Sequence, residues 1–416
     1  MKASAPGAAA SRAADADTVL EPIAPFSIAR LPRIEFGAGS LARLPTLIQG
    51  YGRRLALVTG ARSFLTSRFG AALLAALRQA GLQWQQITVD GEPSPQLVDE
   101  AARELRAFAP ELVVGIGGGS VLDAAKAIAG LVRVEHSVMD FLEGIGPELP
   151  YPGPALPFIA VPTTAGTGSE ATKNAVLGVQ GVQGFKKSFR HERLVPEVAL
   201  IDPDLLENCP QPQIAANAMD ALTQLMESYV SLRANPFTDA LAESGVRAIR
   251  EGLWAWYKET DQAAAGRARL AYGALLSGIC LAQTGLGAVH GLAAPLGAFF
   301  PIPHGVVCGT LLAVTTRTNI AALRSRDPDS PARDKYARLG NLLTGRQHQN
   351  ARNAREALCL LLEDWIEELQ LPRLSAYGMT EADIPRVVAN ARGSSMKTNP
   401  IVLSDEELAE ILRQRL

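Results

Sequence analysis

Short apolar runs alternate with amphipathic stretches through the first half of the chain. The runs with the pattern of buried strands are residues 55–59, 86–89, 112–116 and 158–161. Helical patterning is expected between them at residues 64–79, at 96–107, and from just after Ser120 to Ala129. Continuously apolar strands that alternate with helices indicate a parallel sheet covered by helices on both faces.

The pattern becomes almost entirely helical after residue 203. Ala- and Leu-rich stretches predict helices at residues 213–230, 237–257, 268–283, 351–369 and 405–412, with a polar loop at 324–333. We therefore expect three parts: a disordered tail (1–24), an α/β domain (25–205) and an all-α domain (206–416). Ligand sites tend to lie in the cleft between two such domains.

Length, charge and hydropathy limit the function classes. A chain of 416 residues is long enough for two cores, and its formal net charge is only -2 with both signs interspersed. No apolar run reaches the roughly 20 residues of a membrane helix, and the tail lacks the apolar segment of a signal peptide. We expect a cytoplasmic protein with a small-molecule substrate and with neither nucleic acid nor a membrane as partner.

The cysteines are widely and irregularly spaced, at Cys209, Cys280, Cys308 and Cys359, and none forms a CxxC pair. This spacing indicates buried, inert thiols in a reducing compartment. It argues against both a disulfide framework and a thiolate metal site.

A glycine-rich turn follows the strand expected at residues 112–116. Gly117, Gly118, Gly119 and Ser120 stand where the next helix begins. Glycines let a ligand approach the backbone, and a helix N-terminus favours a pyrophosphate. The alternative is a simple turn with Ser120 as helix N-cap, and the motif is not the GxGxxG fingerprint.

A second loop, PTTAGTGSE at residues 162–170, follows the strand expected at 158–161. Thr163, Thr164, Thr167 and Ser169 provide small hydroxyl donors suited to phosphates or a ribose. A turn with Ser and Thr caps is the alternative.

Three potential metal ligands stand out in the helical half. His290 and His304 lie in apolar surroundings and each precedes a glycine, while Asp220 lies in an apolar helix with Gln224 four residues later on the same face. A buried carboxylate needs a partner, and a cation held by Asp220, His290 and His304 would supply one. Alternatively, the histidines are ordinary core residues and Asp220 caps a helix or pairs with an arginine.

Four motifs occur in the order GGGSVLDAAKAIA, PTTAGTGSEAT, DALTQLMESYVS and HGLAAPLGAFFPIPHG, followed by Asn399-Pro400. Together they resemble the iron-containing (group III) alcohol dehydrogenases from about residue 31 to the end. The resemblance implies a dinucleotide-binding α/β domain with a dehydroquinate-synthase-like parallel sheet, an all-α metal-binding domain and a cleft between them. By analogy it also implies a homodimer or larger homo-oligomer.

The family's divalent iron or zinc is held by an Asp, a His four residues later and two further His. Asp220, His290 and His304 match three of these ligands, but Gln224 replaces the first His, and Ala294 replaces a further His common in the family. The carbonyl oxygen of Gln224 can ligate a metal, so Gln224 is expected as the fourth ligand, but it is a weaker and harder donor than imidazole and metal affinity should fall.

The implied reaction is reversible hydride transfer between NAD(P)(H) and an alcohol or aldehyde, assisted by the metal as Lewis acid. His290 and Lys186 are the residues assigned to catalysis. Lys186 matches a family lysine that reaches the cofactor, and Asp123, within the first motif, is also expected to contact it.

The choice between NADP and NAD depends on the strand ends. Gly60 stands where the family often has an Asp that binds the adenosine ribose, and Arg62 follows. A missing carboxylate and a nearby Arg favour NADP(H), although Asp90 at the next strand end could bind the ribose of NAD(H).

Three other functions remain open on the sequence. One is a metal-independent reductase that resembles maleylacetate reductase, and another is a non-redox enzyme that resembles dehydroquinate synthase. The third is a binding protein that keeps the dinucleotide but has lost the chemistry.

Overall fold

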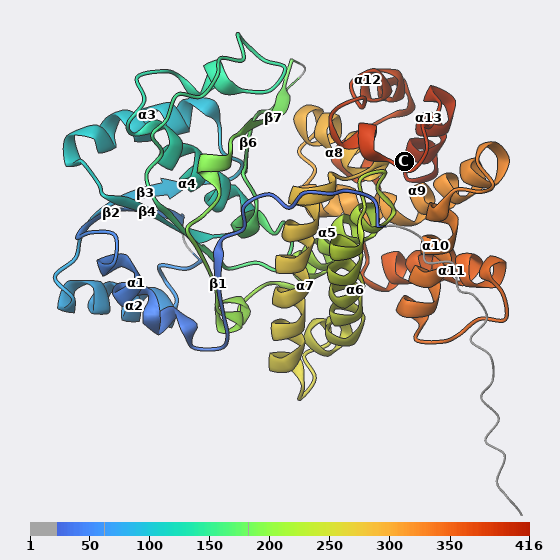
Figure 1. Cartoon of the computed structure of the whole chain (residues 1–416), viewed down its shortest axis with the longest axis horizontal. Helices are drawn as coiled ribbons and strands as arrows, with labels where there is room; N and C mark the ends of the chain where they lie inside the picture. The colour runs from blue at the N-terminus through green and yellow to red at the C-terminus, as the bar shows by residue number, and fades with distance from the viewer. Residues whose placement is uncertain (1–22, 62, 182) are drawn as a thin grey trace, which may run out of the picture.

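The computed structural model describes residues 23–61, 63–181 and 183–416. Nearly all of the predicted disordered tail (1–24) lies outside the described residues, and so does Arg62. The described chain forms an α/β domain next to a helical domain, with α5 (Gln211–Val230) and α7 (Ala263–Thr284) along their boundary (Figure 1). This arrangement confirms the predicted fold class.

Six parallel strands form one sheet within the described residues, in the order β1-β8-β5-β4-β2-β3. They are β1 (Arg33–Phe36), β2 (Arg54–Gly60), β3 (Gln83–Val89), β4 (Leu112–Gly117), β5 (Phe158–Pro162) and β8 (Val198–Ile201). The four predicted strands are confirmed, and all of them end at the same edge of the sheet. The sequence interpretation missed β1 and β8, which have only four residues each and therefore little pattern.

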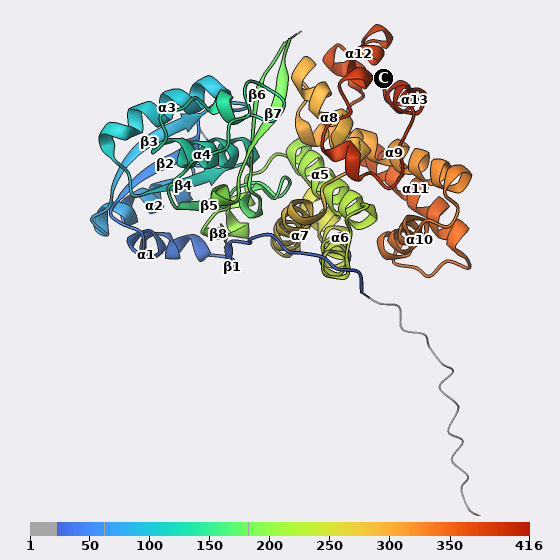
Figure 2. The same cartoon turned by 45° about the horizontal axis from the view of Figure 1, so that its top comes forward.

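Helices cover both faces of this sheet, as predicted. Leu55 and Leu57 of β2 pack with α1 (Leu44–Gln49) and α2 (Arg68–Gln79). Ala56 and Val58 of the same strand pack with α3 (Pro95–Phe108) and α4 (Gly119–Leu131). Figure 2 shows the two helix layers on opposite sides of the sheet. The predicted helix at 64–79 begins only at Arg68, because Ser67 caps it by accepting from the Gly70 amide.

An antiparallel hairpin of β6 (Asn174–Val179) and β7 (Phe185–Arg190) stands apart from the sheet and was not predicted. β7 contacts α8 (Ala288–Phe299) of the helical domain. Figure 2 shows this hairpin standing at the boundary between the domains, beside α8. The hairpin therefore carries Lys186 toward the cleft.

The helical domain is built around α5 (Gln211–Val230), which packs against α6 (Pro236–Tyr257), α7 (Ala263–Thr284) and α9 (His304–Arg326). The remaining helices are α10 (Pro331–Thr344), α11 (Ala351–Glu368), α12 (Ile384–Ala389) and α13 (Asp405–Gln414). The loop predicted at 324–333 was largely wrong: only residues 327–330 connect α9 to α10. Arg324 and Arg326 belong to the last turn of α9, where cations are favourable, and Arg333 belongs to the first turn of α10.

α9 is long and apolar enough, by length and composition, to cross a membrane, with a mean hydropathy of 1.4 over its most apolar stretch. In this structure 78% of that stretch is buried inside the protein. A helix that is apolar on all sides fits a core position, and this explains why no amphipathic pattern marked it in the sequence.

Candidate active site

A cleft of about 1120 Å³ lies between the two domains. Its α/β wall comprises the ends of β2 and β3 and the two predicted loops, and its helical wall comprises parts of α5, α9 and the segment after α11. Of the predicted site residues, those that line it are Asp90, Gly118, Gly119, Ser120, Thr164, Thr167, Asp220 and His304. The two groups of candidates therefore face one cavity.

The first glycine-rich loop presents a helix N-terminus to the cleft. α4 begins at Gly119, and its N-cap is Gly118, which has no side chain with which to cap the helix. Ser120 lies within the first turn, so the alternative in which Ser120 is the N-cap is wrong. The exposed amides and the positive end of the helix dipole suit a phosphate group.

The two loops are packed too closely for larger residues. A Cβ atom on Gly119 would lie 2.7 Å from Thr167 Cγ2, and one on Gly117 would lie 2.5 Å from Val121 Cγ2. The amide of Thr163 donates to the Gly117 carbonyl at 2.9 Å. Glycine is therefore required here by the contact between the loops as well as by any ligand.

Ser169 and Asp123 lie behind these loops in a buried polar network. Ser169 Oγ donates to Asp123 Oδ1 at 2.5 Å. The fully buried Lys126, which the sequence interpretation did not single out, donates to Ser169 O, Thr172 Oγ1 and Asn174 O at 2.7–3.0 Å. These bonds hold the second loop against α4.

Burial dominates the electrostatics of this network. It lowers the pKa of Lys126 to about 8 despite the favourable charge of Asp123. It also raises the pKa of Glu170, which is 3% exposed, to about 7.

The ends of β2 and β3 lie side by side, with Gly60 paired to Val89. Asp90 is exposed and lines the cleft, and Ala61 lines it next to Gly60. Both positions proposed to discriminate between the two nicotinamide cofactors are therefore at its rim.

Lys186 lies against α8 and forms an ion pair with Glu92, with Nζ 3.0 Å from Oε2. Its side chain is 14% exposed, and its charge acts on His304. Glu92 lines the cleft, so Lys186 approaches it from the hairpin side.

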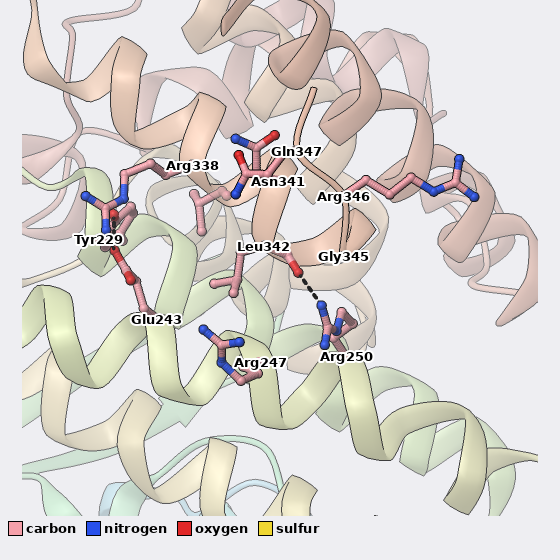
Figure 3. Close-up of a pocket in the computed structure, with 11 residues that line it drawn as sticks. Tyr229, Glu243, Arg247, Arg250, Arg338, Asn341, Leu342, Gly345, Arg346 and Gln347 are labelled. Atoms are coloured by element: carbon pink, nitrogen blue, oxygen red, sulfur yellow. Dashed lines mark hydrogen bonds and ion pairs between the residues drawn. The ribbon is translucent and has the colours of Figure 1, made fainter. Parts of the chain in front are cut away.

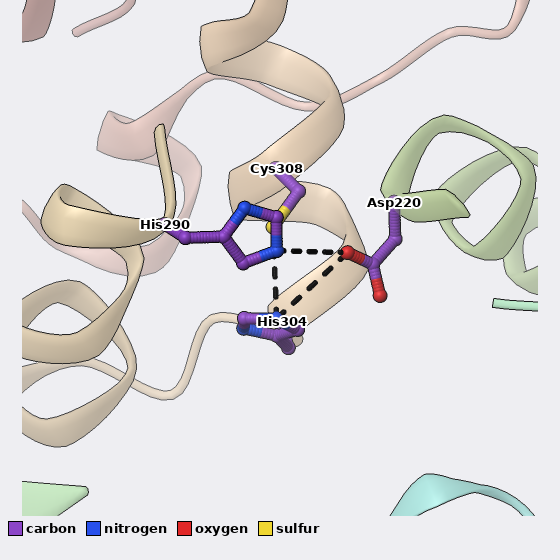
Figure 4. A group of neighbouring side chains, drawn as sticks. All are labelled: Asp220, His290, His304 and Cys308. Atoms are coloured by element: carbon purple, nitrogen blue, oxygen red, sulfur yellow. Dashed lines mark hydrogen bonds and ion pairs between the residues drawn. The ribbon is translucent and has the colours of Figure 1, made fainter. Parts of the chain in front are cut away.

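Asp220, His290 and His304 converge on one point of the helical wall (Figure 4). Asp220 Oδ1 is 3.4 Å from His290 Nε2 and 3.8 Å from His304 Nε2. Cys308 joins them, with Sγ 3.5 Å from His290 Nε2 and 3.7 Å from His304 Nε2. One donor atom from each of the four residues lies within 4.8 Å of the others, and this set fits a divalent cation.

Cys308 was missed because the sequence interpretation assigned all four cysteines to inert thiols. The four are free, and Cys209 is the one that is only partly buried. The available signal was spacing: Cys308 follows His304 by four residues and therefore shares its helix face.

Glu227 is a second residue that the sequence interpretation missed. Its Oε2 is 2.7 Å from His290 Nδ1, and its Oε1 accepts from the Val289 amide at 2.7 Å. Nδ1–H donates to this carboxylate, so once His290 has lost its Nε2 proton the Nε2 lone pair faces Asp220 and Cys308 and is available to a cation. Glu227 lies seven residues after Asp220 on one face of α5, a spacing that could have revealed it.

Asn399 completes the support of His290. Its Oδ1 accepts from the Ala288 amide at 3.1 Å, so Asn399 and Glu227 together satisfy the first amides of α8. A Cβ on Gly287 would lie 2.8 Å from both side chains. The segment around His290 is therefore fixed by α5 and by the C-terminal region.

Gln224 lies at the edge of the cluster. Its Nε2 donates to Asp220 Oδ1 at 3.4 Å, and its Oε1 accepts from Ser277 Oγ at 3.0 Å. In this orientation the amide nitrogen, which cannot ligate a metal, faces Asp220.

Charge coupling within the cluster is strong. Burial opposes ionisation of Asp220, but the charge of His304 and hydrogen bonds from His290 and Cys308 lower its pKa to about 2. Burial likewise lowers the pKa of His304, to about 4. Asp220 is thus an anion at neutral pH, as a cation site needs.

A second, smaller cavity of about 530 Å³ lies between α6 and α10, away from the cleft (Figure 3). Four arginines line it, but Arg338 pairs with Glu243 at 2.9 Å and Arg250 donates to the Leu342 carbonyl at 2.9 Å. It contains none of the predicted site residues.

Comparison with known families accounts for both halves of the chain. Residues 32–203 match the model of iron-containing alcohol dehydrogenase, and residues 214–416 match that of the Fe-containing alcohol dehydrogenase family, C-terminal. The chain therefore belongs to the iron-containing alcohol dehydrogenase family, and the predicted resemblance is confirmed.

Individual relatives agree in activity. The chain is 30% identical to an NADPH-dependent butanol dehydrogenase of Clostridium saccharobutylicum, over 92% of this chain and 96% of that protein. It is 33% identical to a 1-propanol dehydrogenase of Salmonella typhimurium, over 80% and 85%. A crystal structure of 1,3-propanediol oxidoreductase superposes with a TM-score of 0.85 at 28% identity, over 94% and 100% of the two chains. The chain is an NAD(P)-dependent alcohol dehydrogenase, and its family implies a metal ion.

Proposed function

We propose that this protein interconverts short aliphatic aldehydes and primary alcohols with NADP(H), assisted by a divalent metal held by Asp220, His290 and His304. The observation that carries the proposal is that the cleft with the exposed α4 N-terminus also contains the side chains of Asp220 and His304. The relatives named for butanol, 1-propanol and 1,3-propanediol support the substrate class.

The two walls of the cleft have different roles in this proposal: one binds the cofactor and the other holds the metal. The amides of Gly119 and Ser120, with Thr164 and Thr167, bind the pyrophosphate and orient the dinucleotide. Asp220 and His304 would hold the metal at the end of the cleft where the reaction occurs. Glu227 keeps His290 in the tautomer whose Nε2 faces this metal site. When bound, the metal would polarise the carbonyl oxygen and stabilise the alkoxide.

Part of the helical wall is apolar, although Gln211, Gln213, Asn217 and Gln370 also line the cleft. Leu369, Leu371, Pro372 and Tyr377 line the cleft there. An apolar lining would exclude water from the path of the hydride and favour an aliphatic chain over a charged substrate. Lys186 would steady the cofactor from the hairpin side.

NADP(H) is favoured over NAD(H) by two observations. Gly60 has no carboxylate with which to repel a 2′-phosphate, and the butanol dehydrogenase relative is NADPH-dependent. Asp90 at the rim would bind a ribose 2′-hydroxyl instead if NAD(H) were the cofactor.

We also propose a homodimer or larger homo-oligomer in the cytoplasm. β1 is an edge strand of the sheet that exposes Ile34 and Phe36, and the segment before it exposes Phe26 and Ile28. An apolar sheet edge favours pairing with a second copy. Light scattering would test the assembly.

The activity is tested by following NADPH and NADH oxidation with propanal and butanal after dialysis against iron(II) or zinc. We expect turnover with the reconstituted protein, with NADPH preferred, and little after chelation. Equal turnover after chelation would support a metal-independent reductase instead.

A further inference from the structure

The fourth protein ligand of the metal is absent from its expected position. Gln224 turns its amide nitrogen toward Asp220, and its oxygen accepts from Ser277. The ligand set is therefore incomplete on α5. On α9, however, Cys308 lies one turn after His304 and faces the same point.

We propose that Cys308 is the fourth protein ligand, so that this enzyme has an Asp-His-His-Cys centre in which a thiolate on α9 replaces a histidine on α5. The inference rests on the metal of the proposed function and deepens it. On metal binding the S–H bond breaks, the sulfur bonds to the metal and the proton passes to solvent.

Four of the six donor–donor distances lie near those of a tetrahedral four-ligand centre, and the other two are within 4.8 Å. With Zn–N and Zn–O bonds of about 2.0 Å and a Zn–S bond of about 2.3 Å, tetrahedral geometry separates two N or O donors by about 3.3 Å and S from N by about 3.5 Å. Asp220 Oδ1 is 3.4 Å and 3.8 Å from the two imidazole Nε2 atoms. Cys308 Sγ is 3.5 Å and 3.7 Å from them.

The surroundings leave the sulfur few other roles. Cys308 is fully buried, and its neighbours within the cluster are all potential ligands. Nδ1 of His290 is already bonded to Glu227, so Nε2 is the ring nitrogen that faces the sulfur. His304 keeps 27% of its side chain exposed toward the cleft, which leaves an approach for the substrate oxygen.

A thiolate would also change which metal the site prefers. Sulfur is a softer donor than imidazole, and thiolate ligands favour zinc over iron(II) more strongly than a histidine does. We therefore expect zinc to outcompete iron(II) in this protein.

Cobalt(II) substitution tests the ligand directly, because a cobalt–thiolate bond gives a near-ultraviolet charge-transfer band. We expect this band in the wild-type protein loaded with cobalt, its loss in Cys308→Ser, and at least tenfold weaker cobalt binding in that variant. Cys280→Ser is the matched control, since Cys280 is equally buried but lies on α7 and donates to Thr238 O. It should keep both the band and the affinity.

The double variant Cys308→Ser/Gln224→His provides a rescue. Tight cobalt binding without the band would support the exchange of ligands between α9 and α5. Wild-type protein that binds cobalt with no thiolate band, or a band that survives in Cys308→Ser, would overturn the inference and leave metal-assisted reduction intact. Activity with propanal in protein that binds neither cobalt nor zinc would overturn both.

Discussion

On the α/β side of the cleft the proposed pyrophosphate site consists mainly of backbone amides at the start of α4, whereas on the helical side the proposed metal site consists of ionisable side chains. The first wall needs small residues within one short segment. The second brings together Asp220 of α5, His290 of α8, and His304 and Cys308 of α9. A wall of the first kind is defined by local sequence, and one of the second kind only by tertiary packing.

Removal of the carboxylate charge of Asp220 on the helical wall should have the largest effect, a loss of activity. In Asp220→Asn the shape is kept but the anion that attracts the metal is lost, so kcat/KM should fall about 1000-fold. Steady-state NADPH oxidation with butanal measures this. The dissociation constant for NADPH should remain unchanged, because it depends on the other wall. An unchanged kcat/KM would mean that the chemistry proceeds without the metal.

The α/β wall also contains buried charges, but they should act on stability. The pKa of Glu170 is raised by burial to about 7 from an ordinary 4.5. Below pH 4.5 the group is protonated in both states. As the pH rises from 4.5 to 7 the unfolded chain ionises first, so stability is lost. The free energy of unfolding of the wild type should therefore fall by about 3 kcal/mol relative to Glu170→Gln across this window.

Urea denaturation of both proteins from pH 4 to 8 checks this result. The difference in free energy of unfolding between the two proteins should stay constant above pH 7. If the free energies of unfolding of the two proteins changed in parallel over the whole pH range, Lys126 would already compensate for the charge of Glu170. The buried carboxylate would then ionise with an ordinary pKa.

Loss of a residue that supports the metal donors should weaken metal binding less than loss of a donor itself. Glu227→Gln weakens the bond that orients His290, so metal affinity should fall by about 10- to 100-fold. Competition with a chelator measures it. Glu243→Gln is a matched control in the same domain, since Glu243 bonds Tyr229 and Arg338 away from the cluster. Equal losses in the two variants would indicate a general destabilisation of the helical domain.

The difference between the walls also explains what the sequence could predict. The glycine loop, the strand before it and α4 were predicted because their signals are contiguous. For Cys308 and Glu227 the sequence offers only a shared helix face with His304 and with Asp220, and their significance depends on α5, α8 and α9 meeting in space. Asp220, His290 and His304 were singled out and grouped around a cation from the residues alone, but ordinary core histidines and a capping or ion-paired Asp220 remained alternatives until the family resemblance was added.

The same reasoning applies to the fold. β2 to β5 and α5 to α7 have strong periodicity or length and were predicted. β1 and β8 are too short to stand out, and α9 is buried on too many sides to show an amphipathic face. The predicted loop at 324–333 failed because polar residues at helix ends resemble those of loops.

The smallest expected effect comes from a substitution in the α/β wall of the cleft alone. In Gly119→Ala the added Cβ would lie 2.7 Å from Thr167 Cγ2, so the two loops must separate by a few tenths of an ångström. Strain of this kind typically costs about 1–3 kcal/mol, so NADPH binding should weaken about tenfold while metal affinity is unchanged. Gly393→Ala is the control, because nothing lies within 4 Å of its added Cβ. Fluorescence titration with NADPH measures both variants. If metal affinity fell together with NADPH affinity, the two walls would be coupled, and the separation of their roles would be wrong.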